Sequence, residues 1–185
     1  MIMTDLRKEV IAVCANSSHN FSKTMQTEIK LITMQGIEGD AHCGKYVKHQ
    51  SRVKKNPKQI NLRQVHLMQK ELFDELLIEG FEIKPGNLGE NITTSGIDLI
   101  NLPKYTILNI GTQVQLEVTG LRDPCWQIDS YNKGLLKKVV SKDQDGNIIR
   151  KTGIMTMVKS GGIVKKGDNI EMIMPEEPHY KLEVV

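Results

Sequence analysis

Aromatic residues are scarce in this sequence, at 4% of the chain, although 39% of its residues are hydrophobic. The core must therefore be built mainly from Val, Ile, Leu and Met. Long apolar runs are also missing. No stretch of about 18 apolar residues occurs, so we expect no transmembrane helix and no membrane partner. The opening residues, MIMTDLRKEV, lack the apolar centre of a signal peptide. These absences favour a cytoplasmic protein.

Cysteine is rare as well. The chain has three cysteines and no CxxC pair, which argues against a disulfide framework and against a structural zinc site. Because cytosolic thiols stay reduced, each cysteine needs its own explanation. Cys14 lies in the apolar stretch EVIAVCA and is interpreted as a small core residue. Cys43 is interpreted as an accessory or exposed thiol.

Neither sign of charge is in large excess. The net charge of +3 gives no argument for a nucleic-acid partner. The length of 185 residues fits one domain, residues 1–185, and no repeat or linker divides it. Basic residues are concentrated in residues 45–58, which have almost no acid. We expect a loop insertion there, either a solvated surface run or a rim that attracts anions to a site.

Short apolar, β-branched stretches dominate the regular pattern. Such stretches predict strands over residues 9–15, 28–34, 61–67, 106–110, 113–119, 154–158 and 170–174. Apolar residues at helical spacing predict an amphipathic helix over about 66–79, and a shorter helix is predicted over 131–140. The Gly111-Thr112 link predicts a two-residue hairpin loop. The fold class is therefore mainly β with some α: a β-barrel with a few peripheral helices and a loosely ordered tail at 175–185.

Polar, turn-rich stretches are where binding chemistry is expected, because a rigid scaffold commonly presents functional groups on its loops. Five stretches stand out: GIEGDAHCG (36–44), LRQV (62–65), PGNLGENITTSGIDL (85–99), LRDPCWQID (121–129) and SGGIVKKGD (160–168). In this order they resemble a MOSC domain, the module named for the C-terminal region of molybdenum-cofactor sulfurase. The resemblance covers about residues 9–173 and is to the stand-alone bacterial members.

The resemblance carries several expectations. The family fold is rich in β-barrel structure, and its members are associated with the molybdenum cofactor or a related sulfur-bearing species. The family cysteine follows the hairpin, which places it at Cys125. In the family this thiolate ligates molybdenum or is proposed to carry sulfur as a persulfide. Cys125 is thus the expected catalytic residue and molybdenum ligand.

Cys125 can be interpreted either as a functional residue or as a structural one. A thiolate is the reactive form of cysteine, and Arg122 and Arg63 are positioned in sequence to stabilise it by charge. The alternative is an inert buried thiol. Arg63, inside an apolar stretch, needs a partner if buried. It would either form a structural ion pair or hold a phosphate or pterin edge. Trp126 is interpreted either as part of a pocket wall or as a core residue, and we favour the core.

Four further residues are candidates for cofactor binding. His42 either caps its loop or faces the site. Asn91 can donate and accept hydrogen bonds, which suits a pterin edge, but it could equally tie down its own turn. Gly161 and Gly162 permit close backbone approach to a ligand, and a turn alone also explains them.

The resemblance, taken together with these residues, implies three candidate functions. The first is a molybdenum-cofactor-binding oxidoreductase that reduces N-hydroxylated compounds with electrons from a partner protein. The second is a sulfur carrier for metal–sulfur cofactor assembly, in which Cys125 accepts sulfur from a cysteine desulfurase. Pyridoxal phosphate would then be bound only by that separate partner. The third is a non-catalytic module that binds an anion or a partner.

Overall fold

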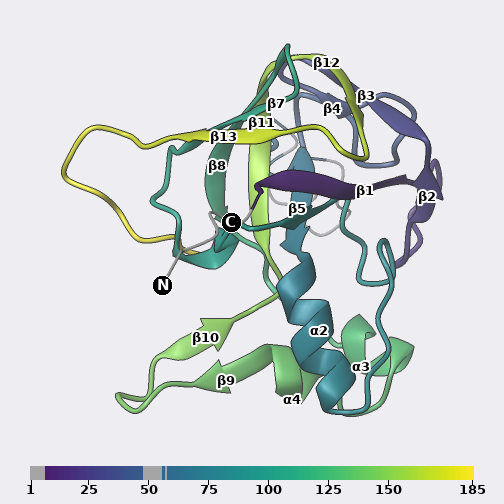
Figure 1. The fold of residues 1–185 in the computed structure, drawn as a ribbon, viewed down its shortest axis with the longest axis vertical. Coiled ribbons are helices and arrows are strands. Elements are labelled where there is room, and N and C mark those ends of the chain that lie inside the picture. The colour runs from purple at the N-terminus through teal and green to yellow at the C-terminus, as the bar shows by residue number, and fades with distance from the viewer. Residues whose placement is uncertain (1–6, 48–55, 57) are drawn as a thin grey trace.

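The computed structural model describes residues 7–47, 56 and 58–185. Its main layer is an eight-stranded sheet, shown in Figure 1. In spatial order the strands are β13 (Ile170–Ile173), β7 (Ile107–Ile110), β8 (Val114–Leu121), β11 (Ile154–Ser160), β5 (Val65–Gln69), β6 (Ile92–Ser95), β1 (Glu9–Ala15) and β2 (Thr24–Gln26). Its neighbouring strands are antiparallel except for the parallel pair β5 and β6.

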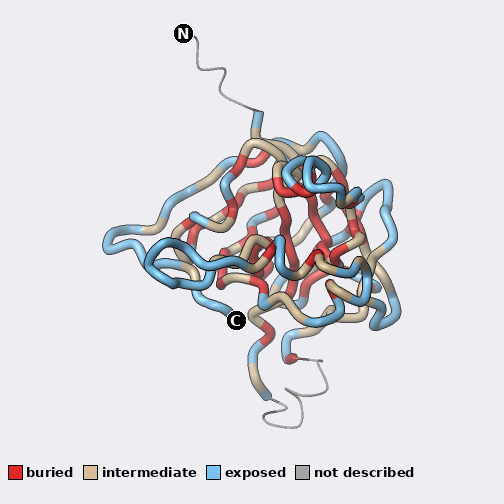
Figure 2. Tube along the Cα trace, turned by 90° about the horizontal axis from the view of Figure 1, so that it is seen from below, coloured by how far each residue is buried: buried red, intermediate tan, exposed pale blue. Residues whose placement is uncertain are grey.

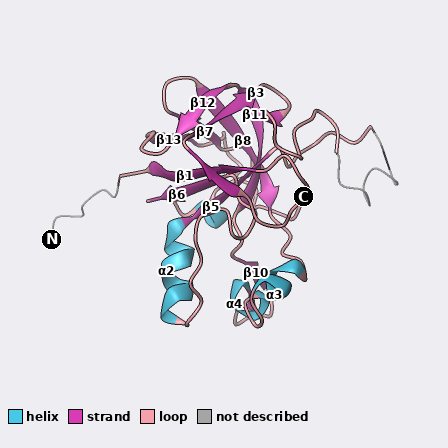
Figure 3. Cartoon of the chain, turned by 90° about the vertical axis from the view of Figure 1, so that its right-hand side faces the viewer, coloured by secondary structure: helices cyan, strands magenta, loops and turns pink. Residues whose placement is uncertain are grey.

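Two smaller sheets and a few helices complete the described part of the chain. The first sheet contains β12 (Gly162–Lys165), β3 (Glu28–Ile32) and β4 (Gly36–Ile37), and the second contains β10 (Ile148–Arg150) and β9 (Val140–Lys142). The helices are α2 (Lys70–Ile78), α3 (Gln127–Tyr131), α4 (Leu136–Val139) and the short 3-10 helix η1 (Leu99–Asn101). Figure 3 shows α2, α3 and α4 gathered on one side of the strands. None of the described helices has the length and apolar character needed to cross a membrane.

The core follows the sequence periodicity. In β8, Val114, Leu116 and Val118 alternate with more exposed residues and are fully or almost fully buried. They belong to an aliphatic cluster between the strands, which appears as the red interior of Figure 2. A second cluster lies under the helices and includes Leu72 and Leu76 of α2. Cys14 is fully buried in β1, which confirms its interpretation as a core residue.

Most predicted elements are present, with shifted ends. The strand predicted over 9–15 is β1, with the same bounds, and the amphipathic helix is α2. The predicted hairpin is β7–β8, but Ile110 pairs with Val114, so its loop also includes Gln113. The short helix predicted over 131–140 is present only in part, as α4, and a separate short helix, α3, precedes it.

The predicted closed barrel is not what the described strands form. The eight-stranded sheet ends at β13 and β2, which do not pair with each other in the described part of the chain. The predominantly β class is confirmed. Most of the 45–58 insertion lies outside the described residues, although Val47 donates a backbone hydrogen bond to Gln59, at 3.0 Å.

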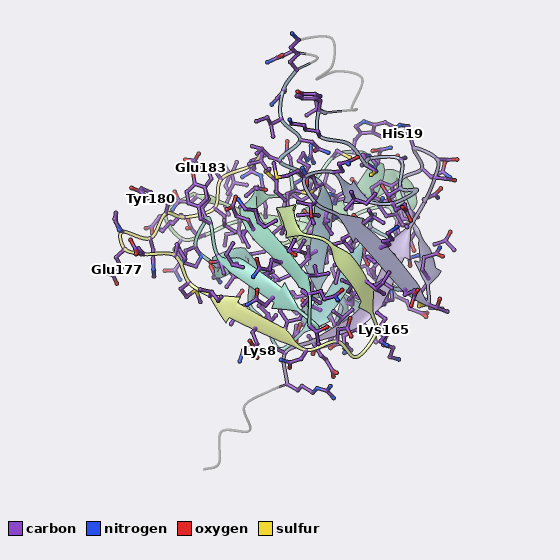
Figure 4. The ribbon with its side chains drawn as sticks, turned by 90° about the horizontal axis from the view of Figure 1, so that it is seen from above. Lys8, His19, Lys165, Glu177, Tyr180 and Glu183 are labelled. Carbon is purple, nitrogen blue, oxygen red and sulfur yellow. The ribbon has the colours of Figure 1, made fainter. Side chains whose placement is uncertain are left out.

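The C-terminal tail was expected to be loosely ordered, and this expectation is wrong. The backbone amide of Leu121 donates to the carbonyl of Glu183 at 2.8 Å, and the amide of Lys104 donates to the carbonyl of Tyr180 at 2.9 Å. The tail therefore packs along the end of β8. Figure 4 shows Tyr180 and Glu183 on the opposite side of the molecule from His19.

Candidate functional site

A cavity of about 450 Å³ is lined by residues from six parts of the sequence. Its lining includes Cys125, His42, Arg63, Asn91 and Arg122, all of which the sequence singled out. The lining also contains residues that the sequence did not single out: His19, Asn20, Phe21, Lys23, Val47, Asn61, His66, Gly89, Asp123, Gln127 and Met155. The scaffold thus places one thiol among several cationic and imidazole side chains.

Gly161 and Gly162 are not among the residues that line this cavity. A Cβ added to Gly161 would lie 2.5 Å from the carbonyl oxygen of Leu31, so a close approach of two chain segments accounts for the missing side chain. The amide of Gly161 donates to Oγ1 of Thr33 at 3.0 Å. Cys43 is half-buried and is likewise absent from the lining.

Asn91 uses its amide to hold three chain segments together. Its Nδ2 donates to the carbonyl of Cys14 at 3.1 Å and to Oδ2 of Asp40 at 3.2 Å, while its Oδ1 accepts from the amide of His66 at 3.1 Å. The side chain therefore does not tie down its own turn. Both amide hydrogens are engaged within the protein, so Asn91 shapes the cavity wall.

Asp40, to which sequence analysis assigned no separate role, contacts three residues that line the cavity: Lys23, His42 and Asn91. Its nearly buried carboxylate forms an ion pair with Nζ of Lys23, which is also nearly buried. The amide of His42 donates to its Oδ1 at 3.0 Å. Burial alone would raise the pKa of Asp40. The hydrogen bonds from His42 and the charge of Lys23 outweigh burial and hold that pKa well below its ordinary value. Asp40 is therefore an anion at neutral pH.

His66 lies on β5 at the floor of the cavity. Its Nε2 is 2.7 Å from the carbonyl oxygen of Thr152, and because a carbonyl only accepts, this nitrogen carries the proton. Burial, together with the positive charge of Arg122, lowers the pKa of His66 to about 3. His66 is therefore neutral at physiological pH. In the sequence, the only signal that could have indicated His66 was a polar residue in a predicted strand.

This pKa predicts a specific loss of stability in mild acid. Unfolded His66 takes up a proton below its ordinary pKa of about 6.5, whereas the folded protein takes it up only near pH 3. Stability therefore falls as the pH drops from 6.5 towards 3, by about 2 kcal/mol between pH 7 and pH 5. Urea unfolding of the wild type and of His66→Gln at pH 7 and pH 5 measures this loss in the free energy of unfolding. Equal pH dependence in the two proteins would contradict it.

Arg122 follows β8 directly and is buried, with 8% of its surface exposed. Its backbone is fixed, because its amide donates to the carbonyl of Gly153 at 3.1 Å. The guanidinium carbon lies 5.8 Å from the centroid of the Phe21 ring. Burial lowers the pKa of Arg122, while the charges of Cys125, Glu90 and Asp123 oppose that shift. An arginine nevertheless stays protonated in proteins.

The guanidinium of Arg122 is incompletely satisfied. Its Nη1 is buried, and no hydrogen-bond partner for it exists among the described residues. A buried charge without a partner is costly, and anions are the natural partners of a guanidinium. Arg122 therefore leaves one buried donor without a partner in the part of the chain that the structure describes.

Cys125 lies in the loop between β8 and α3. The residue is half-buried, and its thiol is 3.3 Å from Oε1 of Gln127. Its carbonyl accepts from the amide of Ile128 at 3.1 Å, at the start of α3. Trp126 is 72% exposed, so its predicted place in the core is wrong. The short helix instead buries Ile128.

The donor set near Cys125 suits a metal that brings ligands of its own. Among the described residues, no three His, Cys, Asp or Glu side chains converge as a metal site. Cys125 lines the same cavity as the unsatisfied cation of Arg122. A metal complex with an anionic group would use both residues, so the site fits the molybdenum cofactor that the sequence resemblance implied.

The fold and cavity define a β-rich domain that presents one thiol beside cationic residues. The family model described as the MOSC domain matches residues 38–171. The chain therefore belongs to the MOSC domain family. A comparison with curated protein sequences finds no match.

Solved structures share this fold. The YuaD protein of Bacillus subtilis is similar over 92% of this chain and 98% of its own, with 23% identity and a TM-score of 0.76. YiiM of Geobacillus stearothermophilus is similar over 90% of this chain and 75% of its own, with 17% identity and a TM-score of 0.64. YiiM of Escherichia coli is similar over 95% and 73%, respectively, with 18% identity and a TM-score of 0.62.

Proposed function

We propose that this protein binds the molybdenum cofactor and reduces N-hydroxylated compounds with electrons from a partner protein. The observation that carries the proposal is the shared cavity of Cys125 and Arg122, in which a thiol accompanies a buried guanidinium with an unsatisfied Nη1. Membership of the MOSC family supports the choice of cofactor. A purely structural arginine would be expected to have all its buried donors paired.

In this proposal each side chain has a distinct role. Cys125 supplies the thiolate ligand, and Arg122 and Arg63 bind the anionic part of the cofactor through charge-assisted hydrogen bonds. Asn91 and the ion pair of Lys23 with Asp40 hold the cavity lining in shape. When bound, the cofactor supplies a metal centre that accepts and passes on electrons. The Cys125 thiolate would also offset part of the charge of Arg122.

Replacement of Cys125 tests the proposal. Wild-type protein purified from a host that makes the cofactor should contain molybdenum at close to one atom per chain, by elemental mass spectrometry. Cys125→Ala should retain less than about a tenth of that amount, because it removes the one cysteine that lines the cavity among the described residues. Cys43→Ala is the matched control, since Cys43 does not line the cavity, and it should retain the metal.

Two outcomes would redirect the proposal. Wild-type protein without molybdenum, prepared beside a positive control from the same host, would contradict cofactor binding. The same samples can be incubated with a cysteine desulfurase and cysteine. A gain of one sulfur mass at Cys125 in metal-free protein would favour the sulfur-carrier function instead.

A further inference from the structure

The imidazole of His42 is paired with a buried carboxylate at the cavity wall. Nδ1 of His42 lies 3.3 Å from Oδ1 of Asp40, the oxygen that also accepts the backbone amide of His42. The carboxylate side chain is 3% exposed, whereas the His42 side chain is 43% exposed. One end of the imidazole is therefore anchored inside the protein, and the rest of the ring lies at the cavity.

The anchor determines which ring nitrogen carries the proton. Asp40 is an anion and can only accept hydrogen bonds, because its hydrogen bonds with His42 and the charge of Lys23 hold its pKa low. Nδ1 of His42 must therefore be the donor. In the neutral ring, Nε2 is then the basic nitrogen, which can take up a proton and deliver it. Asp40 stabilises the imidazolium that forms, as in a carboxylate–histidine pair that serves catalysis.

The surroundings of His42 support a proton-transfer role. The edge of the His19 ring packs against it, with ring centroids 5.2 Å apart and planes at 84°. Lys23 is already paired with Asp40. The lining contains three further charged side chains, those of Arg63, Arg122 and Asp123. Its other ionisable side chains are Cys125 and His66. His66 is neutral, because burial holds its pKa near 3. His42 is thus the lining histidine that has both a carboxylate anchor and access to solvent.

We infer that His42 donates a proton to the leaving oxygen when an N-hydroxylated compound is reduced, with Asp40 as its positioning residue. This inference rests on the proposed function. In the reaction the N–O bond breaks, two electrons arrive from the partner electron-donor protein, and two protons are consumed to form an N–H bond and water. Nε2 of His42 first takes up a proton from solvent and then passes it to the departing oxygen, while solvent supplies the second proton directly.

A spectroscopic test of the pair uses the cofactor-free protein. Long-range proton–nitrogen NMR spectra of ¹⁵N-labelled histidines distinguish the two neutral tautomers, and His42→Asn assigns the His42 signals. We expect neutral His42 to be protonated at Nδ1 in the wild type and to lose this preference in Asp40→Asn, where an amide replaces the carboxylate. Neutral wild-type His42 that carries its proton on Nε2 would overturn the inference.

A second test uses the molybdenum-loaded protein. His42→Ala should keep its molybdenum but lose roughly 100-fold in kcat/KM for reduction, the lower part of the range for general acid catalysis. Added imidazole should restore at least about a tenth of the lost activity. His42→Asn, whose side chain fills the position without an ionisable ring, should be equally slow and should not respond to imidazole. His179→Asn is the control, because His179 lies in the C-terminal tail and does not line the cavity.

The outcomes separate this inference from the proposed function. Active wild-type protein together with His42→Ala within about twofold of it would overturn the role of His42 and leave the function intact. Loss of molybdenum in His42→Ala would make His42 a cofactor-binding residue instead. Loaded wild-type protein that reduces no N-hydroxylated compound would remove the reaction and the proton-transfer role together.

Discussion

Arg122→Met should weaken cofactor binding by at least about 30-fold and leave the ligand-free protein at least as stable as the wild type. The guanidinium is buried, and its Nη1 has no partner among the described residues. Loss of one member of a buried, hydrogen-bonded charge pair typically costs about 2–5 kcal/mol in a complex. A factor of about 30 corresponds to the lower end of that range.

Arg122→Met should weaken cofactor binding without lowering the stability of the ligand-free protein. In the ligand-free protein the buried charge of Arg122 is incompletely paired, which is unfavourable. Methionine keeps much of the apolar volume beside Phe21 and removes that charge. Retained molybdenum after gel filtration, together with urea unfolding of cofactor-free protein, measures both effects.

Arg7→Met is the control for removal of an arginine. Arg7 is exposed, and its Nε lies 3.4 Å from Oε2 of Glu9 in a surface ion pair. Its loss should therefore change the retained molybdenum and the free energy of unfolding little. Full molybdenum content in Arg122→Met would contradict the assignment of Arg122 to the cofactor. A large loss of stability in the cofactor-free variant would mean that Arg122 is mainly a structural residue.

Gly153→Ala should lower the free energy of unfolding by on the order of 3 kcal/mol, or prevent folding. Gly153 has a φ of +80°, and a Cβ there would lie 1.9 Å from the carbonyl oxygen of Leu67. The left-handed conformation costs a residue with a Cβ about 1–2 kcal/mol, and overpacking typically adds about 1–3 kcal/mol. The collision occurs where β11 meets β5, because Ile154 pairs with Leu67.

Gly146→Ala separates the two costs. Gly146 has a similar φ of +84°, but nothing lies within 4 Å of the position that its Cβ would occupy. It should therefore lose only the conformational part. Urea unfolding gives the free energy of unfolding of both variants, and the difference between their losses is the cost of the collision with Leu67. Equal losses would show that the contact with Leu67 is absent in solution. Because Gly153 also accepts the amide of Arg122, a folded Gly153→Ala protein should bind less molybdenum.

Local patterns predicted the elements that depend on local physics. The apolar stretch of β1 and the helical spacing of α2 gave correct elements, because burial of one face imposes its period on the sequence. Trp126 shows the limit of such reasoning. Its apolar character predicted burial, but the direction of a side chain in an irregular loop depends on what packs behind the loop, and there Ile128 fills the interior.

The order of the glycine-rich motifs was enough to predict the family and Cys125 as its cysteine, and the cavity collects Arg122, Arg63, His42 and Asn91 around it. Gly161 and Gly162 were equally prominent in the sequence but lie where strands approach closely. A glycine indicates a close approach or a positive φ, and where space is short the sequence does not say whether a ligand or another strand takes it.

By itself, then, the sequence determined the predominantly β class, the main strands and helix, and the cysteine around which the proposal is built. Only the tertiary structure decided that Lys23, Asp40 and Asn91 form one buried network and that Arg122 has a buried donor without a partner. The reason is that strand and helix periods arise from neighbouring residues. Burial, charge pairing and pKa depend on groups that lie far apart in the sequence and meet only after the sheets have formed.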